Sequence, residues 1–424
     1  MDQGLISVDK WGQPSQAYFL THLHADHTQG LSRRWKRGPL FCSPITAKLL
    51  PTTFPGFDLS LLRVLEIGSA SSVRLVSESS RAEIMVEVTP IDANHCPGAV
   101  MYLFQGELGS FLFTGDFRWE TESQRAQQGK NVLLNALNGR KLDFLYIDNT
   151  YCNPSFCFPS RDIAAKQVVD IIASHPLHDI IISINSLGKE DLLVHVAHAL
   201  NIKIWVWPER LQTMHLLGYR NVFTTDTSLT RVRAVPRYNC TIDTLMALNT
   251  VRGPTIGIIP SGLPWKICSK DKKNKGQRIC IDKSQLTENS SPVRMLHQYL
   301  YSVSYSDHSC FSEILELVSI LQPSHMRGIV SSSFCYVNPS RYFGHLCGIS
   351  RNNDPSCSNS KSNYEDQDAE VRETDSFIRW DSFHKMTGTG ERASNLAYCG
   401  VKRRSANQLR RERCGAKIAE SDGN

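Results

Sequence analysis

Hydrophobic and polar residues change their spacing near residue 160, and this change divides the chain into two patterns. Between Ala17 and about Asn149, short apolar segments alternate with turns that contain glycine, which is typical of β-strands. We expect strands at Ala17–Thr21, Ile84–Ile91, Val100–Phe104, Phe111–Thr114 and Leu142–Ile147. Polar residues follow several of these segments directly, so the strand ends are candidates for a functional site.

From about Ser160 onwards, helical and strand periodicities alternate. We expect helices at Arg161–Ser174, Lys189–Ala199 and Glu209–Leu217, and strands at Ile180–Ile184 and Ile202–Trp207. This alternation predicts a parallel sheet flanked by helices. Apolar patterning returns in Phe311–Leu321 and Met326–Val330, which predicts that the chain rejoins a packed layer there.

Two polar segments differ from both patterns. Residues Lys266–Pro292 are rich in lysine and are typical of a solvated loop or insertion, with a DNA-facing loop as the alternative. Beyond about Tyr342 the chain is rich in serine, asparagine and charged residues without periodicity. We therefore expect residues 341–424 to be disordered.

Length, charge and cysteine content restrict the protein class broadly. A chain of 424 residues exceeds one usual hydrophobic core, which favours two domains and a tail. The net charge of +6 permits a polyanionic partner but does not require one. The thirteen cysteines include no Cys-x-x-Cys pair, the N-terminus lacks a signal-peptide pattern, and no apolar run reaches about 18 residues. We expect a reduced, intracellular and soluble protein.

A cluster of potential metal ligands follows the first of the predicted strands. His22, His24, Asp26 and His27 form the pattern His-x-His-x-Asp-His where the strand Ala17–Thr21 ends. Imidazole and carboxylate groups suit zinc in a hydrolytic site, where one coordination position stays open for water. A bare His-x-His would be weak evidence, because isolated histidines are more often surface or core residues.

Further ligands are expected where two later strands end. His95 lies in Asp92-Ala93-Asn94-His95-Cys96-Pro97-Gly98, and Asp116 lies in Thr114-Gly115-Asp116-Phe117. The ligands predicted for a first metal ion are His22, His24 and His95, and those for a second are Asp26 and His27, with Asp116 bridging both.

Asp9, in Ser7-Val8-Asp9-Lys10-Trp11, is expected to orient a ligand histidine by accepting its second ring N–H. Together, Asp9, the cluster at 22–27, His95 and Asp116 resemble the metallo-β-lactamase superfamily in order and residue type. That signature alone covers lactamases, glyoxalase II, lactonases and nucleases, so further residues must select the substrate.

Asp148, in Tyr146-Ile147-Asp148-Asn149-Thr150, and His308, in Tyr305-Ser306-Asp307-His308-Ser309, enclose the helix–strand region. This arrangement resembles the β-CASP branch, in which a cap domain is inserted into the metallo-β-lactamase body and nucleic acid binds in the cleft between them. The resemblance covers roughly residues 1–335. It implies that Asp148 and His308 pair beside the metals, where His308 would protonate the leaving oxygen or bond a phosphoryl oxygen.

The third added motif of that branch falls at Val330, where RNA-processing members carry a histidine. Valine favours the DNA-directed members, and the chain is most similar to a 5′ exonuclease of the DNA cross-link repair nucleases. The valine also removes one ligand from the second metal. We therefore expect one tightly bound Zn²⁺ and a weaker site for Zn²⁺ or another divalent ion.

Ser186, Gly188 and Lys189 join a predicted strand to a predicted helix. Free backbone N–H groups, a flexible glycine and a cation at this corner predict a pocket for a terminal 5′-phosphate. The alternative is that Ser186 caps a helix and that Lys189 is solvated.

The expected fold is α/β: a metallo-β-lactamase αββα sandwich formed by residues 1–155 and 301–340, an inserted α/β β-CASP domain at 156–300, and a basic tail at 341–424. The resemblance implies a metal-dependent 5′-to-3′ DNA exonuclease in interstrand cross-link or double-strand-break repair, with telomere end processing left open. The residues expected to act in catalysis are Asp26, Asp116, Asp148 and His308. An RNA-processing nuclease, a small-molecule hydrolase and a non-catalytic scaffold are the alternatives.

The tail contains Lys402-Arg403-Arg404 and Arg410-Arg411 with Arg413, the spacing of a nuclear import signal or of a phosphate-binding arm. We expect a nuclear protein whose partner is DNA, with DNA-repair or telomere proteins as further partners through the tail and no membrane association.

Overall fold

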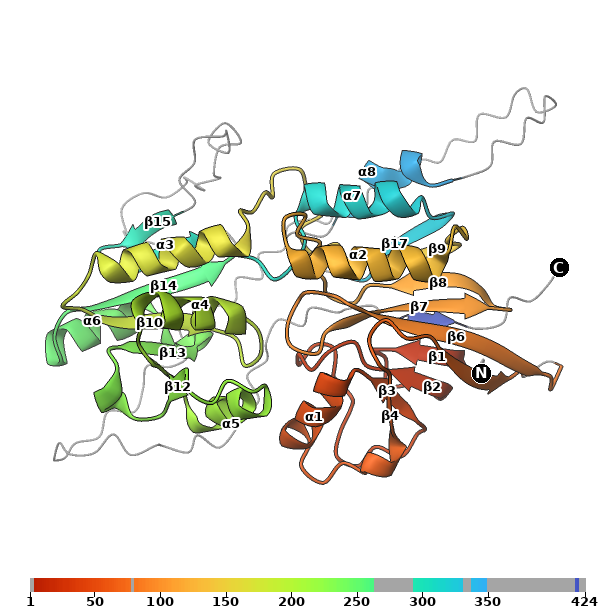
Figure 1. Cartoon of the computed structure of the whole chain (residues 1–424), viewed down its shortest axis with the longest axis horizontal. Helices are drawn as coiled ribbons and strands as arrows, with labels where there is room; N and C mark the ends of the chain where they lie inside the picture. The colour runs from red at the N-terminus through yellow and green to blue at the C-terminus, as the bar shows by residue number, and fades with distance from the viewer. Residues whose placement is uncertain (1–3, 78–79, 263–292, 331–336, 349–415, 419–424) are drawn as a thin grey trace, which may run out of the picture. The chain divides into compact units, whose positions relative to one another are not determined.

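The computed structural model describes residues 4–77, 80–262, 293–330, 337–348 and 416–418 (Figure 1). Within these residues the strands form three sheets. The lysine-rich segment at 266–292 and the basic clusters of the tail lie outside the described residues, so the predictions for both remain predictions.

Two of the sheets pack face to face. The five-stranded sheet has the order β18-β1-β2-β3-β4, formed by β1 (Gly4–Val8), β2 (Ser15–Phe19), β3 (Leu40–Cys42), β4 (Leu62–Val64) and β18 (Ala416–Ile418). The six-stranded sheet has the order β17-β9-β8-β7-β6-β5, formed by β5 (Ser71–Val76), β6 (Glu83–Asp92), β7 (Val100–Gly106), β8 (Gly109–Phe113), β9 (Phe144–Ile147) and β17 (His325–Gly328).

Strand β7 explains why this arrangement has four layers. Its side chains alternate between two cores, since Tyr102 and Phe104 pack against the five-stranded sheet, and Met101 and Leu103 face the helices. Helices α2 (Gln124–Leu137) and α7 (Phe311–Leu321) cover that outer face, and α1 (Pro44–Thr53) covers the outer face of the five-stranded sheet (Figure 1). The predicted αββα sandwich is confirmed. We call it the first lobe.

The third sheet has seven strands in the order β12-β11-β13-β10-β14-β16-β15. Its strands are β10 (Asp179–Ile184), β11 (Ile204–Trp205), β12 (Phe223–Thr224), β13 (Val232–Pro236), β14 (Thr255–Ser261), β15 (Val293–His297) and β16 (Leu300–Ser304). Neighbouring strands are parallel except β15 and β16.

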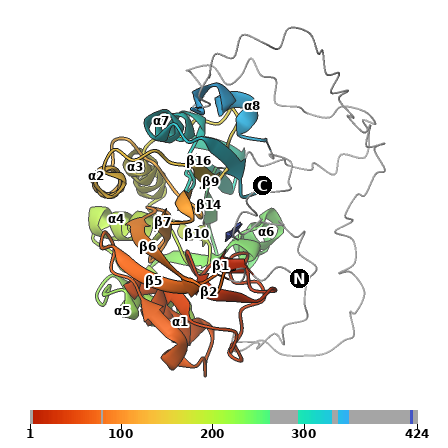
Figure 2. The same ribbon diagram turned by 90° about the vertical axis from the view of Figure 1, so that its right-hand side faces the viewer.

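Helices cover both faces of this sheet. Those helices are α3 (Arg161–Ala173), α4 (Glu190–Leu200), α5 (Pro208–Leu216) and α6 (Ile242–Val251). Figure 2 shows α3 and α4 on one side of β10 and β14 and α6 on the other, and each side has its own apolar cluster. The predicted parallel sheet flanked by helices is therefore confirmed, and we call it the inserted lobe.

The remaining helical segments are short: η1 (Leu59–Leu61), η2 (Thr227–Leu229), η3 (Arg237–Asn239), α8 (Ser340–Phe343) and η5 (Gly344–Leu346). After the inserted lobe the chain returns through α7 to β17, which pairs in parallel with β9 and completes the six-stranded sheet. Among the described residues, no helix combines the length and apolar character needed to cross a bilayer.

One prediction needs correction. The strand expected at Ile202–Trp207 is limited to β11, Ile204–Trp205, which pairs with the equally short β12. Near the end of the chain, the short strand β18 pairs with β1, which would otherwise be an edge strand. The domain boundaries stay predictions; β16 belongs to the seven-stranded sheet and crosses the boundary predicted at residue 300.

Candidate metal centre

The segment from His22 to His27 turns sharply after strand β2. Leu20 still bonds the neighbouring strand through Phe41, but the N–H groups of His27 and Thr28 both donate to the carbonyl of His24. This turn brings the rings of His22, His24 and His27 to the same side of the chain. The sequence pattern at the strand end therefore produces a cluster of imidazoles.

Two glycines allow the other strand ends to approach these rings. Gly98, with φ of 83°, lies in the loop that carries His95, and a β-carbon there would come within 2.7 Å of Thr46 Oγ1. Gly115, with φ of 52°, precedes Asp116, and its β-carbon would lie 2.9 Å from the Thr21 side chain. Any larger residue would push His95 or Asp116 away from the cluster.

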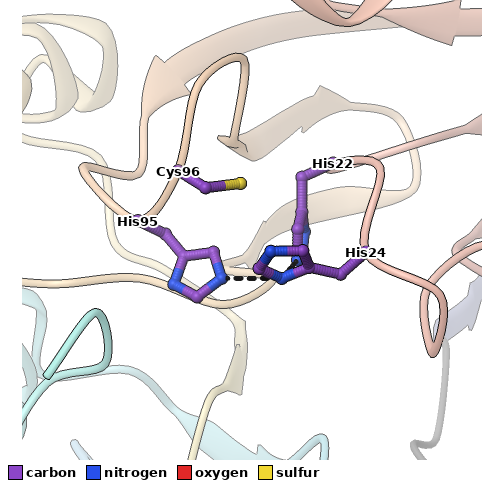
Figure 3. Close-up of side chains that lie close together, drawn as sticks. All are labelled: His22, His24, His95 and Cys96. Carbon is purple, nitrogen blue, oxygen red and sulfur yellow. Dashed lines mark hydrogen bonds between the residues drawn. The ribbon is translucent and has the colours of Figure 1, made fainter. Parts of the chain in front are cut away.

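Three ring nitrogens converge on one point. His24 Nδ1 lies 3.0 Å from His22 Nε2 and 3.1 Å from His95 Nε2, and Figure 3 shows the rings facing one another. Asp116 Oδ2 is 3.7 Å from the His22 nitrogen and 3.6 Å from the His95 nitrogen. Three nitrogens and one carboxylate at this spacing form a donor set that suits a zinc ion.

The other ring nitrogens show why a cation fits here. His24 Nε2 lies 3.0 Å from the carbonyl of Leu187, and His95 Nδ1 lies 2.7 Å from the carbonyl of Asp307. A carbonyl only accepts, so these two nitrogens carry the protons. In a neutral ring the opposite nitrogens then hold lone pairs, which face each other across 3.1 Å. Burial lowers the pKa of His24 to about 4, which favours the neutral ring and hence a metal cation.

A second group of donors adjoins the first. His27 Nε2 lies 3.3 Å from Asp116 Oδ1, so the two oxygens of Asp116 face both groups, as expected for a bridging carboxylate. His27 Nδ1 lies 2.6 Å from Asp9 Oδ2, which also accepts the Thr21 hydroxyl. Asp26 is half-buried and belongs to none of the donor groups found among the described residues, although its charge acts on His24.

Asp148 and His308 meet beside this cluster, as the sequence predicts. His308 Nδ1 lies 2.7 Å from Asp148 Oδ2, and His308 Nε2 lies 3.9 Å from Asp116 Oδ2. Burial by itself would raise the pKa of the Asp148 carboxyl, but His308 and two hydrogen bonds from Thr150 lower it below its usual value. Asp148 is therefore an ionised group that holds the His308 ring in place.

Val330 provides no metal ligand at the position of the third motif. Its side chain packs in the apolar core between the two sheets of the first lobe. Its backbone N–H and carbonyl both bond the side chain of Asn149, at 2.9 and 3.2 Å. These contacts fix the chain next to Asp148. Val330 adds no donor to the second group, which contains His22, His27 and Asp116.

The corner at residues 186–190 differs from its prediction. The Gly188 N–H is not free, because Glu190 reaches back and accepts it at 2.9 Å. Lys189 Nζ is bonded to Asp307 Oδ2 at 2.8 Å, and Ser186 is exposed. A cavity of about 310 Å³ opens here, beside His95, and Arg125, Arg161 and Lys189 line it.

Cys96 and Asp307 also lie at the site, although the sequence pattern does not indicate them. The Cys96 sulfur lies within the His22, His24 and His95 group (Figure 3), but burial, with Glu190 and Asp307, raises its pKa well above the usual value, so it is a protonated thiol. Asp307 links His95 to Lys189. Both residues adjoin predicted site residues in sequence, which is the one signal that could have indicated them.

Comparison with known families agrees with this geometry. A family model described as "Beta-lactamase superfamily domain" matches residues 8–154, and one described as "DNA repair metallo-beta-lactamase" matches residues 218–333. The chain is thus similar to metallo-β-lactamase domains over residues 8–154 and to DNA-repair metallo-β-lactamases over residues 218–333. The first match falls on the first lobe, and the second falls on the later part of the inserted lobe and the returning chain.

Curated relatives of the chain are named 5′ exonuclease or DNA cross-link repair protein. The chain is 38% identical over 347 residues to 5′ exonuclease Apollo of Gallus gallus, covering 80% of this chain and 64% of that protein. It is 38% identical over 336 residues to the Mus musculus protein of the same name, covering 78% and 54%, and 31% identical over 323 residues to DNA cross-link repair protein SNM1 of Arabidopsis thaliana, covering 73% and 60%. The chain thus spans between half and two thirds of each relative. The predicted resemblance is confirmed.

Proposed function

We propose that the protein is a metal-dependent DNA nuclease that removes nucleotides in the 5′-to-3′ direction from 5′-phosphorylated ends, in cross-link or double-strand-break repair. The observation that carries the proposal is the convergence of three imidazole nitrogens and Asp116 beside the Asp148–His308 pair. The relatives named 5′ exonuclease support the direction of attack.

His22, His24, His95 and Asp116 would hold a zinc ion, and His27 and Asp116 would hold a weaker second ion. Asp26, which lies outside these donor groups, would become a ligand of the second ion only after its side chain moved towards them. Nitrogen and carboxylate donors fit zinc, and Asp116 presents an oxygen to each group. When bound, zinc would lower the pKa of water to about 7 and so supply the nucleophile. Asp9 keeps His27 oriented by accepting the Nδ1 proton.

His308 would assist the departure of the 3′ oxygen. Asp148 binds its Nδ1, so its Nε2 points towards Asp116 and the metal residues. A proton on that nitrogen then lies on the side where the leaving oxygen must form, which is the geometry required of a general acid. Asp148 contributes by fixing the ring.

The cavity beside His95 would receive the terminal 5′-phosphate. Its cations Arg125, Arg161 and Lys189 are already bonded to carboxylates, so a phosphate would share or replace the partner of Lys189, which is Asp307. Ser186 is exposed at the same corner but does not line the cavity, so its hydroxyl would reach the phosphate from outside the cavity. The Gly188 N–H is excluded from this role by its bond to Glu190.

The proposal extends to the organisation and place of action of the protein. The metallo-β-lactamase domain would comprise residues 1–155 and the part of 301–340 that follows β16, the inserted β-CASP domain residues 156–300 together with the rest of β16, and the tail residues 341–424. DNA would bind between the lobes, and the protein would act in the nucleus, where its DNA substrate lies. DNA-repair or telomere proteins would bind through the tail.

The decisive experiment digests 3′-labelled DNA and RNA oligomers that carry a 5′-phosphate or a 5′-hydroxyl, in the presence of zinc. Wild-type protein should shorten phosphorylated DNA stepwise from the 5′ end, and Asp116→Ala should leave it intact because that variant lacks a donor to both metals. Internal cuts would indicate an endonuclease, preference for RNA would indicate an RNA-processing enzyme, and equal behaviour of wild type and variant would exclude the proposed chemistry.

A further inference from the structure

The inserted lobe contacts a predicted metal ligand through the backbone of the loop at 186–190. The Leu187 carbonyl accepts the Nε2 proton of His24 at 3.0 Å, which fixes the tautomer that points Nδ1 at the metal position. The Leu187 side chain is 6% exposed and packs in the core between the six-stranded sheet and its helices. The position of one carbonyl in the inserted lobe therefore decides how a ligand in the first lobe is presented.

This loop has a conformation that must be held from outside. Gly188 has φ of 101° and Lys189 has φ of 65°, so two consecutive residues are in the left-handed region. Such a conformation is unfavourable for a lysine, whose β-carbon crowds the following carbonyl oxygen. Lys189 is also the N-cap of α4, and its side chain makes no capping hydrogen bond there. Local sequence preferences alone would not maintain this path.

Arg210, from helix α5, supplies the external support. Its side chain is fully buried, its Nη1 donates to the Ser186 carbonyl, and its Nη2 donates to the Gly188 carbonyl at 2.9 Å and to Glu190 Oε1 at 2.7 Å. The two carbonyls lie on either side of Leu187. Glu190 in turn accepts the Gly188 N–H at 2.9 Å, which closes a network around the loop.

We propose that Arg210 is a positioning residue of the metal centre: its guanidinium fixes the Ser186 and Gly188 carbonyls and so holds the Leu187 carbonyl against His24. A planar group with several N–H donors suits this task, and a lysine cannot reproduce its geometry. The inference rests on the proposed metal site and deepens it, since it makes metal affinity depend on the inserted lobe.

Arg231 provides a matched control. Its guanidinium also bonds three carbonyls of one segment, at Ile172, His175 and His178. That segment precedes β10, whereas the Arg210 loop follows β10, so the two arginines hold opposite ends of the same strand. Arg231→Lys should disturb the inserted lobe as much as Arg210→Lys does, without a contact to His24.

The test measures Zn²⁺ affinity by chelator competition and the visible absorption of the Co²⁺-substituted full-length protein. Arg210→Lys should weaken Zn²⁺ binding about tenfold and change the Co²⁺ spectrum, as loss of a group that orients a metal ligand typically does. Arg231→Lys should match wild type in both. If Arg210→Lys does not fold, the double variant Glu190→Gln/Arg210→Met removes the buried pair together and should show the same loss.

Failure of this inference is distinguishable from failure of the proposed function. If wild-type protein binds Zn²⁺, His24→Ala weakens that binding, and the Arg210 variant retains wild-type affinity and spectrum, the role of Arg210 is overturned while the metal site stands. If wild type and His24→Ala bind Zn²⁺ equally weakly, the metal site and the inference are both overturned.

Discussion

The candidate metal centre and the cavity beside it differ in how their charges are balanced. At the metal centre, ring nitrogens and the Asp116 carboxylate face one another, so electron pairs are concentrated at one place. In the cavity, each lining cation is already bonded to a carboxylate. The pairs are Arg125 with Asp92, Arg161 with Glu120, and Lys189 with Asp307.

This difference determines what each region requires from outside. The metal centre needs an added cation before its donors can lie so close together without repulsion. The cations of the cavity are neutralised by carboxylates without a ligand. An anion can bind only if it shares or replaces one of these carboxylates. The first region should therefore respond strongly to metal removal, and the second should show graded effects of single substitutions.

Metal removal should produce the largest effect. Exhaustive treatment with a chelator should reduce DNA hydrolysis by about a thousandfold, because the metal supplies several kcal/mol of transition-state stabilisation. It should also lower Tm, since a ligand that binds only the folded protein stabilises it. Readdition of Zn²⁺ should restore both. Unchanged hydrolysis by protein that elemental analysis shows to be metal-free would mean that hydrolysis does not require a metal.

Asp148→Asn should have the next largest effect. The amide cannot hold His308 as the carboxylate does, so kcat should fall by about 10²- to 10⁴-fold, the usual contribution of acid–base catalysis. Zinc content should not change, because Asp148 is outside the proposed ligand set. Asp143→Asn, at the other end of β9, is a suitable control: Asp143 also accepts a backbone N–H, from Ser110 at 2.8 Å, and this variant should retain its activity.

Lys189→Met should destabilise the protein in a pH-dependent manner. Burial alone would raise the pKa of Asp307, but Lys189 lowers it below its usual value, so the pair stabilises the folded state above the unfolded pKa of about 4. That stabilisation is lost as the pH falls through the folded pKa. Breaking the buried pair should cost about 3–5 kcal/mol at pH 7, and the difference in Tm from wild type should shrink below pH 4.

The exposed ion pair between Arg74 and Glu83 is a control for the stability measurement on Lys189→Met. Arg74 and Glu83 are 68% and 61% exposed in their side chains and lie 3.4 Å apart. Arg74→Ala should change stability by less than about 1 kcal/mol at any pH. An equal Tm loss in Arg74→Ala and Lys189→Met would mean that the Lys189–Asp307 pair does not support the cavity.

Ser186→Ala should have the smallest effect and act on substrate preference. Removing one exposed hydroxyl should reduce discrimination between 5′-phosphate and 5′-hydroxyl DNA by roughly fivefold, the value of a single hydrogen bond. Hydrolysis of 5′-hydroxyl DNA should stay unchanged. If the variant still prefers phosphorylated ends as strongly as wild type, the phosphate does not contact Ser186.

The proximity of His22, His95 and Asp116 could be predicted from sequence because each residue lies just beyond a strand end. The turn at His22–His27 is local, and the loops carrying His95 and Asp116 follow β6 and β8, which lie on either side of β7 in the six-stranded sheet. The position of Asp26 could not be predicted in this way. It lies within the motif, yet the backbone turn leaves it outside the donor groups found among the described residues.

The support around the ligands could not be predicted, because it comes from distant parts of the chain. Arg210 lies on an amphipathic helix and looks like any surface arginine in the sequence, but packing buries it completely. The Leu187 carbonyl has no side-chain signal at all. The Gly188 N–H was wrongly expected to be free, since nothing in the sequence shows that Glu190 would fold back onto it.

The parallel pairing of β17 with β9 also has a consequence for biosynthesis. During translation, β9 leaves the ribosome long before β17 and α7, because the entire inserted lobe is made in between. Until they arrive, β9 has one unpaired edge and the apolar residues Leu142 and Leu145 lack their α7 neighbours. A nascent chain at this stage should depend on chaperones. A nonsense mutation within the inserted lobe should therefore yield an aggregating fragment rather than a partly active enzyme.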